Sequence, residues 1–152
     1  MLEQQENKPT EKEHIIDDVR SYFLKDWPEG VHLEQAYLHI GMYLGWIIEH
    51  DLYSEDFEEE FDVQIFRFKK RDLSCIIIGE LWDGIISMDQ FCLPEGCDFT
   101  DYYYAGGVYL QDYKEVFHCN EATMFDVEDS WENYEKMILK INERYEAWKA
   151  GA

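Results

Sequence analysis

The sequence predicts a mostly α fold: a single compact domain of five to seven helices with little or no strand. With 46% apolar residues, 152 residues suffice for one core. In several segments apolar residues recur at three- and four-residue steps, and some of these segments follow a serine suited to cap a helix. We assign the domain to residues 14–150. Residues 1–13 are polar, aperiodic and interrupted by Pro9, so we expect a disordered tail.

The strongest predicted helix runs from Leu33 to His50. Its apolar positions cover nearly the whole circumference, which is typical of a buried central helix. Gly41 and Gly45 lie on one face of it, and each costs about 1 kcal/mol relative to alanine. We therefore expect another backbone to approach this face closely. The apolar residues at helical spacing are Leu33, Ala36, Tyr37, Ile40, Leu44, Ile47 and Ile48.

Shorter elements surround this helix in the sequence. Residues 15–23 follow helical spacing over one or two turns, and residues 27–30 are predicted to form a turn. Ser54 is predicted to cap a helix that buries Phe57, Phe61, Ile65 and Phe68. Its acidic start and basic end match the helix dipole, so we assign its charges to helix stability and not to a site.

The second half of the chain continues the pattern. Ser74 is predicted to cap a helix that continues through Trp82, although the β-branched run at 75–78 is also compatible with a strand. A short turn or helix at Ser87 and a break at residues 93–96 follow. The last three predicted helices are Phe99–Tyr104, Val108–Phe117 and a long one capped by Ser130, whose inward stripe is Trp131, Tyr134, Ile138, Ile141, Tyr145 and Trp148.

The charge distribution indicates a partner. The net charge is −21, and residues 72–135 hold fifteen carboxylates against one cation, Lys114, together with six of the eleven tyrosines. Such a surface repels nucleic acid and membranes and attracts basic proteins, and tyrosine is favoured at interfaces. The alternative is a pair of amphipathic helices with solvated acids. The predicted partner-binding residues are Asp83, Asp89, Glu95, Asp98, Asp101, Tyr102, Tyr103, Tyr104, Asp112 and Glu115.

No motif for catalysis or for a metal site is present. The sequence lacks a G-x-S-x-G elbow, an H-E-x-x-H pair, a P-loop and a G-x-G-x-x-G loop, so we predict no catalytic residue, no cofactor and no enzyme activity. Cys92 and Cys97 lack a second ligand pair at zinc spacing, and no window satisfies a calcium loop. His39 and His50 would be roughly 16 Å apart on one helix, too far to share a metal. With no leader sequence, we expect free thiols and a cytoplasmic location.

Five blocks along the chain resemble a bacterial family of uncharacterised small acidic proteins, over roughly residues 15–149. They are His39–Leu52, Leu81–Ile86, Asp98-Phe99 with Tyr102-Tyr103, Tyr109–Tyr113 and Trp131–Tyr134. Members of this family resemble the immunity proteins that bacteria encode beside polymorphic or contact-dependent toxins. The resemblance implies an immunity protein that covers the active site of a basic toxin domain. A nuclease is the natural target, because its surface must be basic to hold phosphates.

Two other functions stay open at this point. The first is a small ligand-binding or enzymatic domain that uses His39, His50 and the tyrosines. The second is an acidic nucleic-acid mimic that competes for a DNA-binding protein. The acidic stretch 55–62, Cys92 and Cys97 look individual to this chain, and function can reside in such variable positions.

Overall fold

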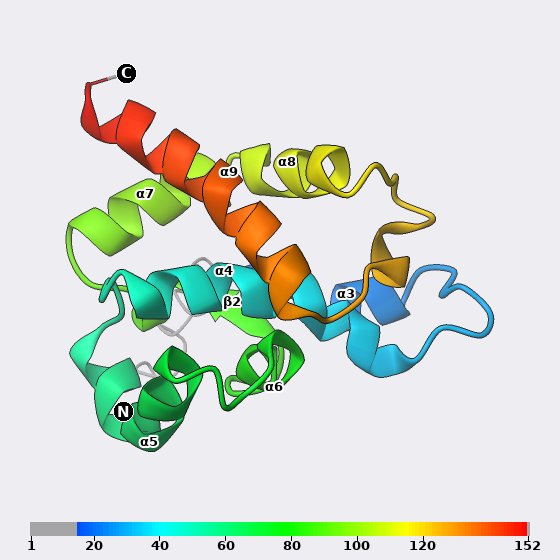
Figure 1. Ribbon diagram of the computed structural model, residues 1–152, viewed down its shortest axis with the longest axis horizontal. Helices are drawn as coiled ribbons and strands as arrows, with labels where there is room; N and C mark the ends of the chain where they lie inside the picture. Colours follow the sequence, from blue (N-terminus) through cyan, green and yellow to red (C-terminus); the bar gives the residue numbers. More distant parts are fainter. Residues whose placement is uncertain (1–14, 152) are drawn as a thin grey trace, which may run out of the picture.

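A computed structural model describes residues 15–151 (Figure 1). In this part of the chain, seven α-helices and three short 3-10 helices accompany a single two-stranded antiparallel sheet, which confirms the mostly α prediction. The tail expected at residues 1–13 lies outside the described residues. Between residues 15 and 151, no helix combines the length and the apolar character needed to cross a membrane.

The elements follow one another in a fixed order along the chain. They are β1 (Ile15–Asp18), α3 (Arg20–Phe23), η1 (Leu33–Tyr37), α4 (Leu38–Glu49), α5 (Glu55–Lys69), α6 (Cys75–Gly79), β2 (Ile85–Ser87), η2 (Met88–Gln90), α7 (Glu95–Tyr103), α8 (Val108–Val116), η3 (Met124–Asp126) and α9 (Trp131–Lys149).

Helix α4 is the centre of the core, as its all-round apolar sequence predicted. Every residue from Leu38 to Ile48 is buried. A methyl group added at Gly41 would lie 1.7 Å from the carbonyl oxygen of Cys75 in α6. One added at Gly79 would lie 2.4 Å from the carbonyl oxygen of Tyr37. The expected close approach of a second backbone is thus confirmed, and the backbone belongs to α6.

The other helices cover α4 on several sides. Helices α5 and α6 lie below it in Figure 1, α9 runs diagonally across it, and α7 and α8 both contact α9. The predicted caps form: the Ser54, Ser74 and Ser130 hydroxyls accept hydrogen bonds from the backbone N–H three residues later, at 3.1, 3.3 and 3.1 Å. Local capping therefore fixes the start of three helices that surround the core.

Three local predictions were wrong in part. Residues 15–18 form β1 instead of a helix, because they pair with β2, a partner that is distant in sequence. The helix after Ser74 ends at Gly79, and Trp82 lies in the turn that leads through Gly84 into β2. The predicted break holds at residues 93 and 94 but ends there, because Pro94 precedes α7 and lacks only an N–H that a helix start leaves unpaired anyway.

Candidate functional site

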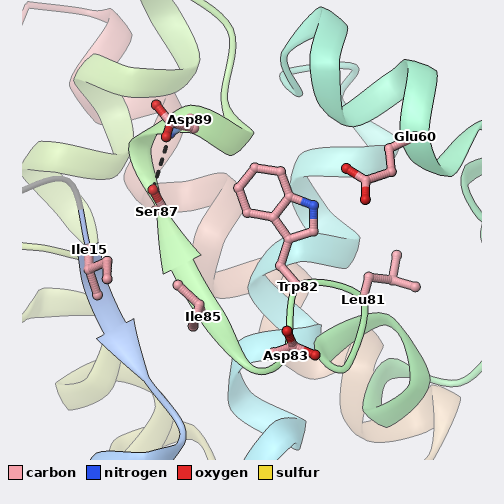
Figure 2. A pocket seen from close by; sticks show the side chains of 8 residues that line it. All are labelled: Ile15, Glu60, Leu81, Trp82, Asp83, Ile85, Ser87 and Asp89. Atoms are coloured by element: carbon pink, nitrogen blue, oxygen red, sulfur yellow. Dashed lines mark hydrogen bonds between the residues drawn. The ribbon is translucent and has the colours of Figure 1, made fainter. Parts of the chain in front are cut away.

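Two adjoining hollows form an acidic groove around Trp82, here called the Trp82 groove. The first, of about 340 Å³, is lined by Ile15, Glu60, Leu81, Trp82, Asp83, Ile85, Ser87 and Asp89 (Figure 2). The second shares Glu60, Trp82 and Asp89 with it and adds Asp56 and Glu59. Five carboxylates thus line the groove, and no described lysine or arginine does.

Hydrogen bonds at the start of α5 bring these carboxylates together. The Ser54 hydroxyl caps α5 and also donates to the carbonyl of Asp89, at 2.7 Å. The Ser54 N–H donates to the carbonyl of Gln90, at 2.8 Å. Residue 54 therefore ties the acidic first turns of α5 to η2, although these segments are more than thirty residues apart in sequence.

The 87–90 segment is itself locally fixed. Ser87 and Gln90 form a capping box: the Ser87 side chain accepts from the Asp89 N–H, and the Gln90 side chain accepts from the Ser87 N–H at 3.0 Å. The dashed line in Figure 2 marks the first of these bonds. The edge of the groove that carries Asp89 is consequently built from short-range contacts.

Trp82 occupies the middle of the groove. Its half-buried indole packs against Phe57 at a ring separation of 6.0 Å. In Figure 2 the indole stands between β2 on one side and the Glu60 side chain of α5 on the other, with Asp83 below it. An aromatic face flanked by carboxylates suits a cationic side chain, because ring and acids both attract positive charge.

The acids of the groove are spread out. Among the described residues, no three His, Cys, Asp or Glu side chains are grouped as a metal site requires. The separate carboxylates suit a broad basic surface with several charges better than a single ion.

The ten predicted partner-binding residues do not lie together: some line the groove, some lie elsewhere on the surface, and some are buried. Only Asp83 and Asp89 line the Trp82 groove. Asp98, Asp101 and Tyr102 are exposed on α7 and Glu115 on α8, whereas the half-buried Glu95 accepts a hydrogen bond from Tyr145. Asp56, Glu59 and Glu60, which we had assigned to helix stability, complete the groove. Two features of the sequence could have identified them: they share one side of a helix, and the helix has more acids than its capping requires.

Placing Tyr103, Tyr104 and Asp112 on the surface was wrong. Tyr103 and Asp112 are fully buried, and Tyr104 is 4% exposed. All three make hydrogen bonds in the interior. The Tyr103 hydroxyl donates to Asp112 at 2.8 Å, and Arg144 donates to the same carboxylate at 2.9 Å. The Tyr104 hydroxyl donates to Asp17 at 2.5 Å.

The tyrosines as a group serve the core. Of the six in residues 72–135, five are buried and only Tyr102, at 45% exposure, reaches the surface. Burial, with a smaller contribution from the nearby Asp112 carboxylate, raises the pKa of Tyr103 above its ordinary value. The expected interface rich in tyrosine is therefore absent from this stretch, and acidity is the property that remains on its surface.

The two histidines are separated by their surroundings. His39 is buried, with Nε2 lying 3.3 Å from the Asp17 carboxylate and 3.2 Å from the Tyr22 hydroxyl. Its Nδ1 has no hydrogen-bond partner among the described residues. His50 is exposed and stacks on Trp46 at 4.2 Å, with Nδ1 lying 3.0 Å from the Trp46 carbonyl. Nothing in this arrangement favours a joint catalytic or ligand site.

Asp17 is held ionised by its neighbours. Burial by itself raises the pKa of this carboxyl group, but the hydrogen bond and charge of His39, with hydrogen bonds from Tyr104 and Tyr22, outweigh it. The pKa of Asp17 consequently lies below its ordinary value. This cluster connects β1, α3, α4 and the end of α7.

These features define a class: a small helical domain with a strongly acidic sequence and an acidic groove on its surface. Residues 15–127 match the family described as a domain of unknown function, DUF7832, and the chain belongs to this family. The matched segment contains the whole Trp82 groove and ends before α9. No curated protein and no solved structure matches the chain.

Proposed function

We propose that this protein is a cytoplasmic immunity protein of a bacterial contact-dependent or polymorphic toxin system. It binds a basic toxin domain, a nuclease, and neutralises it by covering the active site. The observation that carries this proposal is the Trp82 groove, where five carboxylates surround one half-buried indole.

A lysine or arginine of the toxin occupies the groove. Its cationic group lies against the Trp82 ring, an interaction worth about 0.5–2 kcal/mol according to how far the site is desolvated. Glu60, which lies beside the indole in Figure 2, forms a charge-assisted hydrogen bond with it, and Asp83 pairs with a neighbouring cationic side chain of the toxin. These contacts discriminate against acidic partners, because like charges would face each other at close range.

The rest of the acidic surface acts at longer range. Asp98, Asp101 and Glu115 are exposed and lie outside the groove, so they add to the negative potential without being needed for contact. A net charge of −21 steers a basic domain toward this protein and accelerates association at low salt. Contact residues are therefore expected to control dissociation, and remote acids the association rate.

The test is binding of the toxin domain encoded by the adjacent gene, measured by surface-coupled kinetics at low and high salt. The groove variant is Glu59→Gln/Glu60→Gln/Asp83→Asn. The matched control, Glu128→Gln/Glu132→Gln/Glu146→Gln, removes the same charge at exposed positions that do not line the groove.

We expect the groove variant to lose affinity by about tenfold or more, mainly through faster dissociation, and the control to lose much less. If both variants lose the same affinity, net charge alone attracts the toxin domain, and the groove is not its binding site. If no toxin domain binds, or if binding leaves its activity unchanged, the immunity function itself is wrong.

A further inference from the structure

A separate pocket elsewhere on the molecule shares no lining residue with the two hollows of the Trp82 groove. It has a volume of about 370 Å³ and lies between α3 with the residues that follow it, α8, and residues 121–125. Its walls include Tyr22, Trp27, Pro28, Leu110, Met124 and Phe125. We call it the Trp27 pocket. Its volume falls within the range of about 300–1,000 Å³ that is typical of small-molecule sites.

The aromatic walls of the Trp27 pocket are held in place. Trp27 and Tyr22 contact Phe125 at ring separations of 4.6 and 5.5 Å. The Trp27 indole N–H donates to the Val31 carbonyl at 2.8 Å, and the Tyr22 hydroxyl donates to Asp17 at 3.0 Å. Because the polar atoms of both rings already have partners, the rings offer a ligand mainly apolar and π surface.

Charges of both signs also line the pocket. They are Lys25, Asp26, Lys114 and Glu121. Lys114 is the one cation in residues 72–135, and its ammonium group lies 3.6 Å from the carboxylate of Glu121, whose side chain is 83% exposed. The Lys114 side chain is 28% exposed, and a 3.6 Å pair with so exposed a partner contributes little free energy, so both groups are available to a ligand that brings the opposite charges.

We propose that the Trp27 pocket binds a free aromatic amino acid. The ligand ring lies against the pocket-facing sides of Tyr22, Trp27 and Phe125, the α-carboxylate pairs with Lys114, and the α-ammonium group pairs with Glu121. A zwitterion matches this lining better than an aromatic acid does, because the ligand carries no net charge into a protein of net charge −21. It matches better than an aromatic amine does, because such a ligand leaves Lys114 without a new partner.

Ligand binding should also change the NMR resonances of His39, which lies behind two of the lining rings. The buried His39 ring contacts Tyr22 and Phe125, at centroid separations of 5.1 and 6.2 Å. A ligand that packs on these two rings shifts their positions, and the ring-current shifts that they cause at His39 change with them. The imidazole proton resonances of His39 therefore report on occupancy of this pocket.

The test compares L-tryptophan with indole-3-propionate, which lacks the ammonium group, and with tryptamine, which lacks the carboxylate. Titration calorimetry gives the affinities, and proton NMR follows His39. Ala122→Trp, at an exposed lining position, fills the pocket without disturbing the core. Lys114→Gln removes the carboxylate partner, and Lys140→Gln on α9 is the matched control outside the pocket.

We expect saturable binding of L-tryptophan with a shift of the His39 resonances. Each analogue and Lys114→Gln should weaken binding by about tenfold, Ala122→Trp should abolish it, and Lys140→Gln should leave it unchanged. The proposal is overturned if L-tryptophan shows no saturable binding at millimolar concentration, or if Ala122→Trp still binds it normally. An analogue that binds as tightly as L-tryptophan overturns the zwitterion assignment. None of these results depends on the toxin, because the two sites share no lining residue.

Discussion

Gly41 and Gly45 lie one turn apart in α4, but their neighbours differ in kind. The space beside Gly41 is filled by the backbone of α6, which cannot move without displacing the helix. The space beside Gly45 is filled by the ring ends of Phe68 and Tyr134, at 2.5 and 3.1 Å from an added methyl group. Side-chain rings adjust more easily than a packed backbone, so the two glycines should respond differently to the same substitution.

We predict that Gly41→Ala destabilises the protein by about 2 kcal/mol or more, because the clash exceeds the gain in helix propensity of about 1 kcal/mol. Gly45→Ala should cost less, since the rings can shift and the same propensity gain applies. Urea denaturation followed by tryptophan fluorescence measures both. A Gly41→Ala variant as stable as the parent protein would contradict the contact between α4 and α6.

The Asp17 cluster makes stability depend on pH. Because the folded-state pKa of Asp17 is lowered, its contribution is complete above the unfolded value of about 3.9 and is lost as the pH falls through the folded value. We predict that Asp17→Asn costs about 1–3 kcal/mol at pH 7 and that its deficit relative to the parent narrows below about pH 4.

Denaturation curves of both proteins between pH 7 and pH 3 test this, and taking their difference cancels the titration of the many other acids. Asp62→Asn, at an exposed position on α5, is the control and should cost little at any pH. An Asp17→Asn deficit that stays constant down to pH 3 would be inconsistent with the proposed ionised cluster.

At the residue scale, sequence predicts side-chain environments only where position on a helix decides them. Phe57, Phe61, Ile65 and Phe68 were placed inside correctly because their spacing defines one face of α5. Tyr102 and Tyr103 are neighbours on one helix, and only the packing of α8 and α9 decides which of them is buried. Composition could not separate them, because tyrosine is equally suited to a core and to an interface.

At the level of elements, one buried carboxylate joins three helices. Asp112 of α8 is fully buried and accepts hydrogen bonds from Tyr103 of α7 and, through both oxygens, from Arg144 of α9. The pKa of Arg144 is raised, chiefly by its hydrogen bonds to Asp112. This pair is one of the links between α9 and the rest of the domain.

We predict that Arg144→Met destabilises the protein by about 2 kcal/mol or more, because Asp112 then stays buried with Tyr103 alone. Lys140→Met, which removes an exposed pair with Glu143 on the same helix, should change stability by less than about 0.5 kcal/mol. Adding Asp112→Asn to Arg144→Met should recover part of the loss. No recovery would mean that the guanidinium contributes through packing alone.

The elements that sequence could predict are those whose signals are local. Three helix starts could be predicted from Ser54, Ser74 and Ser130, because a cap acts within three residues. The β1–β2 pair was missed because Ile15 finds its partner at Ser87, and no local pattern encodes a register over such a distance.

For the whole molecule, charge opposes compactness. The excess of negative charge, −21 on 152 residues, is repulsive, and at 0.1 M ionic strength salt largely screens the repulsion between charges more than about 10 Å apart. We predict that raising sodium chloride from about 20 mM to about 500 mM increases the melting temperature by about 3 °C or more, equivalent to roughly 1 kcal/mol. Differential scanning calorimetry measures the shift.

Potassium chloride should act like sodium chloride, because screening depends on ionic strength and not on the identity of the cation. A melting temperature that is unchanged or lower in salt would show that the ion pairs at Arg71, Lys69 and Arg144 outweigh the repulsion between the acids.

Only part of the candidate site could be predicted from the sequence, because the groove is assembled from segments that are distant along the chain. Asp83 and Asp89 were identified from charge density, but the matching Asp56, Glu59 and Glu60 had a sufficient local explanation in the dipole of α5. Only the hydrogen bonds from Ser54 to residues 89 and 90 bring the two sets together.

The edge of the family match has a practical consequence. Tyr134, Met137, Ile141 and Tyr145 of α9 are buried, yet all lie beyond residue 127. A protein shortened to the matched segment would expose the rings of Trp46, Phe68 and Phe99, which α9 shields. The folded unit of this protein therefore extends beyond the matched segment, and a shortened variant of it should retain α9.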